Sequence, residues 1–225
     1  MVKSLILAFT ACLFFTSCGK NDSNGATPSL TESYLNIKAG SKWNYELTNN
    51  SAPATTILYT LTSTARDSSI LGDTYHVFVN SRTAASEYNR VSGSDYYSFQ
   101  SLPAELGGAK VENLYLKAGA AVNTSWSQNY NITFNSIPLM VTVTNKIEAK
   151  SLSRTVNATT YNNVIHVSTA IAVAGIPPAG LVTDIDYYYA PNHGLIENTS
   201  KINLNYLTIV NSSDVATRLK TAVLL

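Results

Sequence analysis

Cysteine is nearly absent from this 225-residue chain. Only Cys12 and Cys18 occur, so residues 19–225 can form neither a disulfide nor a thiolate metal site. Charged residues are also scarce, at 13% of the chain, and the formal net charge is +1. A nearly neutral chain gives no electrostatic reason to expect nucleic acid as a partner. Asn, Ser, Thr and Tyr supply the polarity instead, which favours strands and turns over surface helices.

The motifs of common catalytic and cofactor sites are missing as well. The sequence has no Gly-x-Ser-x-Gly, no His-Glu-x-x-His, no phosphate-binding glycine loop and no calcium-loop pattern. His76 and His166 fall on the polar faces of predicted strands and His193 in a turn, so we expect all three to be solvent-facing or turn residues. Asp184 and Asp186 share one strand face, but a cation site would need more oxygen ligands. We therefore predict no enzyme, no metal site and no cofactor.

The start of the chain predicts an export signal. Lys3 precedes an apolar run over residues 5–15, which is too short to span about 30 Å of hydrocarbon as a helix. Small residues then precede Cys18, as signal processing requires. Residues 14–18 resemble a lipobox, where signal peptidase II cuts before a diacylated cysteine, although Phe15 stands where Leu is usual. The resemblance implies removal of residues 1–17 and lipidation of Cys18.

Residues 18–31 predict a flexible tether behind that lipid anchor, because Gly, Ser, Asn and Pro28 dominate them. Several acyl chains would hold the protein on a membrane, since each buried methylene contributes about 0.8 kcal/mol. The segment just after Cys18, with Lys20 and Asp22, weakly resembles the surface-export signals of Bacteroidota lipoproteins. We expect the cell envelope, at the outer membrane, as the location, with the face of that membrane left open.

Alternation of apolar and polar side chains is the dominant signal after Trp43. It is clearest over 139–150, where the odd-numbered positions 139, 141, 143, 147 and 149 are apolar. A period of two predicts a strand with one buried and one solvated face. Further predicted strands cover 43–47, 56–66, 74–81, 86–92, 95–100, 112–117, 126–134, 163–173, 183–190, 194–203, 205–211 and 216–224. Residues 102–106 could form a short helix, and the last segment could be strand or helix, with strand favoured by its threonines.

Short connections rich in turn residues favour an antiparallel meander. A dozen strands cannot stay flat, because sheet twist makes them curl. We therefore predict one mainly β domain over 32–225, a strongly curved sheet or half-barrel, with a two-layer β-sandwich as the alternative. Trp43 and Trp126 lead similar segments 83 residues apart, and paired tyrosines recur later. This pattern predicts two similar halves, about 34–105 and 115–205, with chance similarity as the alternative.

Three segments resemble a group of uncharacterised Bacteroidota envelope lipoproteins. They are residues 34–45, which contain Ala39-Gly40-Ser41-Lys42-Trp43, residues 123–126, and residues 188–196, which read Tyr-Tyr-Ala-Pro-Asn-His-Gly-Leu-Ile. The resemblance implies a mostly antiparallel domain similar to the half-barrels of lipoprotein-localisation factors. It implies no known reaction.

These features favour a non-enzymatic envelope lipoprotein whose curved sheet binds an apolar ligand or an envelope partner. A glycan-binding accessory lipoprotein is the first alternative, because fourteen tyrosines and two tryptophans could stack on sugar rings. Most of these aromatic residues share a face with aliphatic residues and are predicted to be core. Tyr97 and Tyr188 are the candidate ligand-contacting rings. A structural or assembly partner in the envelope is the second alternative.

Overall fold

The computed structural model describes residues 32–225, except 52, 102–109, 135–136 and 208. The predicted signal, Cys18, the tether and the short helix at 102–106 lie outside the described residues. The described part consists of strands joined by turns, with one 3₁₀ turn, η2 (Pro178–Gly180), and no α-helix. The strands are β1 (Lys42–Asn49), β2 (Thr55–Ile70), β3 (Asp73–Asn80), β4 (Ser86–Ser92), β5 (Asp95–Ser101), β6 (Lys110–Lys117), β7 (Ser125–Phe134), β8 (Ile137–Val156), β9 (Thr159–Val173), β10 (Leu181–Ala190), β11 (Gly194–Tyr206) and β12 (Ile209–Val223).

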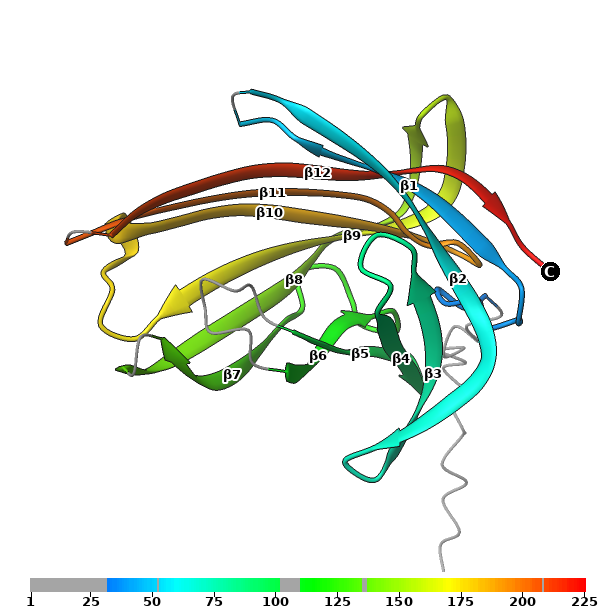
Figure 1. Cartoon of the computed structure of the whole chain (residues 1–225), viewed down its shortest axis with the longest axis horizontal. Coiled ribbons are helices and arrows are strands. Elements are labelled where there is room, and N and C mark those ends of the chain that lie inside the picture. Colours follow the sequence, from blue (N-terminus) through cyan, green and yellow to red (C-terminus); the bar gives the residue numbers. More distant parts are fainter. Residues whose placement is uncertain (1–31, 52, 102–109, 135–136, 208) are drawn as a thin grey trace, which may run out of the picture.

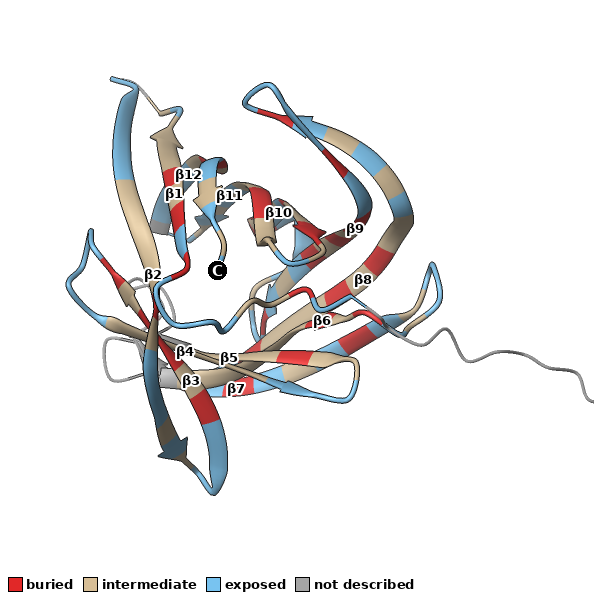
Figure 2. Ribbon diagram, turned by 90° about the vertical axis from the view of Figure 1, so that its right-hand side faces the viewer, coloured by how far each residue is buried: buried red, intermediate tan, exposed pale blue. Residues whose placement is uncertain are grey.

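These strands form one antiparallel sheet in the order β6-β5-β4-β3-β2-β1-β12-β11-β10-β9-β8-β7 (Figure 1). Every neighbour in the sheet is also a neighbour in sequence, except that β1 pairs with β12, from Lys42 opposite Val223 to Asn49 opposite Val215. The sheet curls into a nearly closed barrel (Figure 2). The prediction of a curved antiparallel meander is confirmed. The curvature goes further than a half-barrel, and the last segment is a strand.

The inner face of the barrel is identified by contacts between strands that are not neighbours in the sheet. The rings of Tyr115 on β6 and Tyr189 on β10 lie 5.4 Å apart, although several strands separate β6 from β10 in the sheet order. Around them pack Trp126, Ile147 and other apolar residues. The predicted core aromatics Trp43, Tyr45, Trp126, Tyr130 and Tyr189 are buried. Tyr187 is half-buried.

The two ends of the sheet, β6 and β7, meet through side chains rather than through a backbone ladder. Trp126 Nε1 donates to the Leu114 carbonyl at 2.7 Å, and the Leu114 N–H donates to Gln128 Oε1 at 2.6 Å. Tyr130 donates its hydroxyl proton to the Glu112 carbonyl at 3.0 Å. Side chains of β7 thus form hydrogen bonds with backbone groups of β6 that would otherwise be unpaired at an open sheet edge. We call these contacts the side-chain seam.

The outer half of the β8–β9 hairpin folds back over the outer face of β10–β12 (Figure 2). The bend comes from register shifts between 147 and 154 and from positive φ angles at Ser151 and Asn163. At the hairpin tip the Asn157 amide donates to the Leu219 carbonyl on β12. The predicted strands ended at 150 and began again at 163, so they missed this folded-back part. Bulges break the period of two on which the prediction relied.

Residues 32–40 cross one end of the barrel before β1 begins (Figure 2), and we call them the strap. Tyr34 lies in the core at 7% exposure, and its hydroxyl donates to the Asn163 carbonyl. The Tyr34 N–H donates to the Tyr96 hydroxyl at 3.0 Å. The C-terminus lies at the same end, where the Leu225 N–H donates to Ser41 Oγ. Residue 32, to which the predicted tether is joined, therefore also lies at this end.

Candidate functional site

Away from the strap, the inner face carries apolar side chains that are not fully buried. Tyr45 and Tyr59 stack on the inner face with ring centroids 5.3 Å apart. Leu47 and Ile57 lie opposite each other two residues further along β1 and β2, so they share that face. Leu47 is half-buried and Ile57 is 43% exposed. One exposed isoleucine is ordinary, but neighbouring apolar side chains that are incompletely buried on one face can mark a binding surface.

The same face continues across β12 and β11. The register places Val215 opposite Asn49, and it places Ile202 and Leu204 opposite inner-face positions of β10. All three apolar side chains are half-buried. We call the five residues of this surface the inner apolar patch: Leu47, Ile57, Ile202, Leu204 and Val215.

Polar groups on the inner face adjoin this patch. Ser200 is next to Ile202 on the inner face of β11, and Asn198 lies opposite Tyr187. Burial raises the pKa of Tyr187, and burial together with Glu87 raises the pKa of Tyr59 to about 12. Both phenols therefore stay protonated at neutral pH and keep a hydroxyl proton to donate. The inner face combines apolar area with hydrogen-bonding groups, which suits an apolar or amphipathic ligand.

The two candidate stacking rings predicted from sequence lie on the other face of the sheet. Arg154 places its guanidinium carbon 3.4 Å from the Tyr188 ring centroid, and the His166 ring stacks on Tyr188 at 4.4 Å and 12°. Two groups this close must occupy opposite faces of the ring. Arg90 lies 3.8 Å from the Tyr97 ring centroid. A sugar could therefore stack on Tyr188 only after Arg154 or His166 had moved, and the glycan-binding alternative stays a prediction.

Charged partners hold these covering groups in place. Glu197 is 7% exposed. Its carboxylate accepts hydrogen bonds from Arg154 Nε at 2.7 Å and from Arg218 Nε at 2.9 Å. His166 Nε2 lies 2.6 Å from Asp186 Oδ1. The network joins the folded-back part of β8 to β9–β12, so it fixes the hairpin against the barrel.

His76 was expected to face solvent, and this is wrong, because its side chain is only 11% exposed. Its Nδ1 lies 2.9 Å from Asp67 Oδ1 and its Nε2 lies 2.9 Å from Ser63 Oγ. The carboxylate only accepts, so in the neutral ring Nδ1 carries the proton and Nε2 accepts from the hydroxyl, as in a hydrolase triad. Ser63 is 1% exposed, however, and its backbone is bonded to Gly40 and Ser41. The hydroxyl is closed to a substrate, and the three groups tie β2 to β3.

Metal ligands do not gather in the described part of the chain. No group of three or more His, Cys, Asp or Glu residues there could hold a metal ion. Asp184 and Asp186 lie on one face of β10, as expected; Asp184 is exposed, and Asp186 contacts His166. Among the same residues, no helix has the length and hydrophobicity to cross a membrane.

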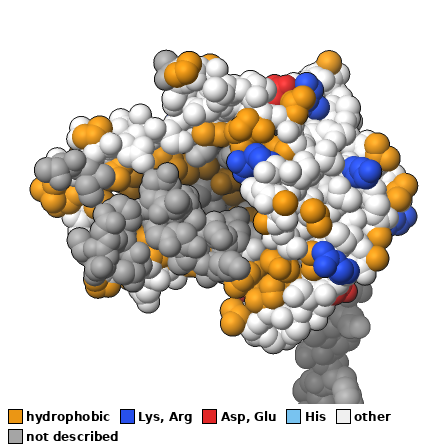
Figure 3. All heavy atoms as spheres, in the orientation of Figure 1, with side chains coloured by type: hydrophobic (Ala, Val, Ile, Leu, Met, Phe, Trp, Pro, Cys, Tyr) orange, Lys and Arg blue, Asp and Glu red, His pale blue; other side chains and the backbone are white. Residues whose placement is uncertain are grey.

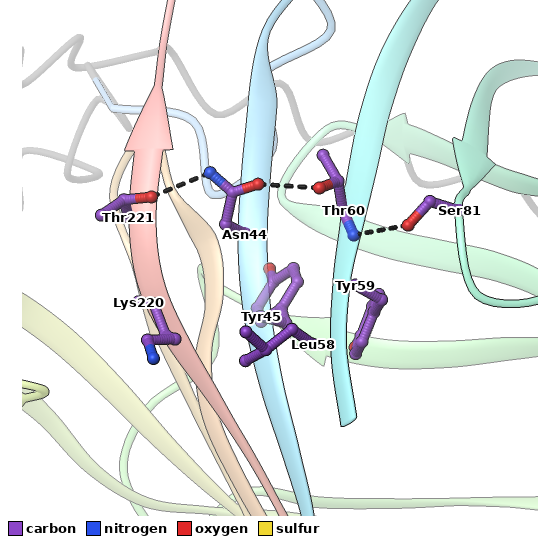
Figure 4. A pocket seen from close by; sticks show the side chains of 8 residues that line it. All are labelled: Asn44, Tyr45, Leu58, Tyr59, Thr60, Ser81, Lys220 and Thr221. Atoms are coloured by element: carbon purple, nitrogen blue, oxygen red, sulfur yellow. Dashed lines mark hydrogen bonds between the residues drawn. The ribbon is translucent and has the colours of Figure 1, made fainter. Parts of the chain in front are cut away.

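Two shallow depressions mark the surface. One, of about 480 Å³, lies at the strap end between the strap, the β10–β11 turn and the C-terminus. The other, of about 330 Å³, lies over β12, β1 and β2. Figure 4 shows the hydrogen bonds beside it, from the Asn44 amide to Thr221 and from the Thr60 hydroxyl to Asn44. On the face seen in Figure 3 hydrophobic side chains are common and charged ones are scattered, so this face carries no broad charged surface.

Comparisons with known proteins give one structural likeness. No family model matches the chain, and no curated protein matches it. A crystal structure described as a "putative lipoprotein" from Parabacteroides distasonis superimposes with a TM-score of 0.49 at 12% identity, over 85% of this chain and 98% of the other. At that score and identity the likeness carries no functional argument.

Proposed function

We propose that this protein is a lipid-anchored envelope lipoprotein whose barrel binds an apolar or amphipathic ligand on its inner face. The inner apolar patch is the observation that carries the proposal. Ile57 is 43% exposed there, opposite half-buried Leu47 and on the same face as half-buried Val215. Full burial of such a side chain contributes about 1.5–3 kcal/mol, so a ligand covering the patch would gain affinity from several of them.

The anchor is the second part of the proposal. The lipobox-like residues before Cys18, and the Gly- and Ser-rich stretch after it, support acylation at Cys18 and attachment to the outer membrane. Ligand binding needs no reaction at the protein, and the sealed position of Ser63 is compatible with a non-enzymatic role.

A pair of adjacent residues on β2 tests the ligand site. Ile57 lies on the inner face, whereas Leu58 is 64% exposed on the opposite face. We expect Ile57→Asn to weaken binding of the hydrophobic probe 1-N-phenylnaphthylamine about tenfold, which corresponds to about 1.4 kcal/mol. Leu58→Asn should bind as the wild type does. Equal binding by both variants, measured by probe fluorescence, would exclude the inner face as the site.

The anchor is tested separately by intact mass and detergent partitioning. The mature protein should begin at Cys18 with added acyl mass and enter the detergent phase. Cys18→Ser should keep residues 1–17 and lose the acyl mass. A wild-type protein without acyl mass would disprove the anchor while leaving the ligand site to its own experiment.

A further inference from the structure

The strap end of the barrel presents an apolar surface with a basic residue in it. The depression there is lined by Leu35, Ile37, Lys38, Leu224 and Leu225, together with Asn36 and Asn192. Ile37 is 52% exposed and Leu225 is 60% exposed. Hydrogen bonds hold the strap in this position. The Ser33 carbonyl accepts one from the Asn192 N–H, and the Lys38 N–H donates another to Asn36 Oδ1. Exposed apolar side chains held on a fixed backbone form a preorganised contact surface.

The position of the chain before residue 32 indicates what this surface faces. Cys18 precedes residue 32 by fourteen residues, which reach at most about 50 Å when fully extended. The opposite end of the barrel lies about one strand length further away, and β12 alone has fifteen residues, or roughly 50 Å at 3.3 Å each. As a flexible chain those fourteen residues span only about 20 Å on average, well short of that distance, so an anchor at Cys18 favours the strap end over the other end beside the bilayer.

We propose that the strap-end surface, namely Leu35, Ile37, Lys38, Leu224 and Leu225, rests on the phospholipid bilayer. This inference rests on the proposed acylation of Cys18. Ile37 and Leu225 enter the interfacial region, and the Lys38 ammonium contacts lipid phosphates. Glu32, also on the strap, opposes this attraction in part, so a few apolar side chains must provide most of the contact.

The tether makes so small a contact effective. Two or three exposed apolar residues would bind a membrane only weakly from solution, but attachment through Cys18 makes the contact intramolecular and raises its effective concentration. The barrel would then hold one orientation, with its strap-covered end on the membrane and the inner apolar patch further from it.

The test places a polarity-sensitive label at either end of the barrel. Cys12 would be removed with the signal and Cys18 would be acylated, so an introduced cysteine is the one free thiol. Ile37→Cys and Leu225→Cys report on the strap end, and Leu207→Cys, at a residue 82% exposed in the β11–β12 turn, reports on the other end. Each is labelled with NBD in the full-length protein and reconstituted into vesicles of phosphatidylethanolamine and phosphatidylglycerol at 3:1.

We expect a blue shift and nitroxide-lipid quenching at residues 37 and 225 and neither at 207. Equal signals at both ends, or no signal at 37 and 225 in protein whose acyl mass has been verified, would overturn the inference and leave the anchor intact. Absence of acyl mass would overturn both. Unfolding midpoints of the three variants verify that each is folded, and residue 225 provides a second probe of the surface should substitution at 37 unfold the domain.

Discussion

The two tryptophans occupy contrasting hydrogen-bonding positions. Trp126 Nε1 donates to the Leu114 carbonyl across the side-chain seam. Trp43 is 3% exposed, and its Nε1 has no hydrogen-bond partner among the described residues. A buried N–H without a partner costs free energy, whereas a made hydrogen bond contributes about 1 kcal/mol. The same substitution should therefore affect stability differently at the two positions.

We expect Trp126→Phe to lower the free energy of unfolding by about 1–2 kcal/mol more than Trp43→Phe does. Both changes remove similar volume, so the difference isolates the indole N–H. Urea unfolding followed by circular dichroism measures it. Equal losses at the two positions would show that the Trp126 contact does not stabilise the seam.

Glu197 provides a second test at the scale of single residues. Its side chain is 9% exposed, and Arg154 is one of its two partners. Arg154→Met should cost about 1.5–3 kcal/mol, the range for hydrogen bonds to charged groups. Lys220→Met, which breaks the more exposed pair with Glu46, should cost at most about 1 kcal/mol. The prediction fails if the two variants unfold at the same urea concentration.

At the scale of elements, alternation predicted most strands because each has one buried and one solvated face. It stopped at 150 because bulges near Ser151 turn the chain. It divided β12 because the exposed polar residues 211–213 interrupt the apolar pattern, and the strand predicted over 205–211 wrongly ran across the β11–β12 turn. The pairing of β1 with β12 joins residues about 170 positions apart, and no local pattern encodes such a contact.

An apolar inner face was predictable from the sequence, but the residues of the inner apolar patch were not. The sequence indicated a curved sheet with an apolar inner face, but strand order, which the sequence did not provide, decides which apolar residues neighbour one another on it. The Ser63–His76–Asp67 contacts were missed for the same reason, since a bulge between residues 63 and 67 sets their spacing. The position of His76 on a predicted polar strand face did not indicate that it contacts Ser63 and Asp67.

The turn into β1 depends on one glycine. Gly40 has φ of +90°, and a Cβ there would lie 2.9 Å from Leu225 Cδ1. Gly93 also has positive φ, but a Cβ there would meet nothing within 4 Å. Gly40→Ala should therefore destabilise the protein by about 1–2 kcal/mol more than Gly93→Ala. The melting temperature of the Gly40 variant should accordingly be the lower of the two. Similar melting temperatures would mean that the C-terminal residue moves aside freely.

At the scale of the whole molecule, the aromatic core makes stability sensitive to alkali. Burial, with smaller contributions from neighbouring groups, raises the pKa of Tyr34, Tyr59 and Tyr130 to about 12 from 10.0. Between these values the unfolded chain releases phenolic protons that the folded protein retains. The stability that these buried phenols contribute is therefore complete below pH 10, and the free energy of unfolding falls as the pH rises towards 12.

We expect the urea midpoint to stay constant from pH 8 to 9.5 and to decrease steeply above pH 10, together with tyrosinate absorbance. Tyr59→Phe should reduce the slope of that decrease, because one raised pKa is removed. A midpoint that did not change up to pH 12 would contradict the burial of these phenols.

The union of β1 with β12 also sets a condition on how the molecule is made. Until β12 emerges from the ribosome, β1 and β11 each lack a neighbour, and the sheet has two additional open edges. Native structure must therefore wait until β12 has been synthesised. A nonsense codon just before β12 would yield an aggregation-prone fragment rather than a smaller working barrel.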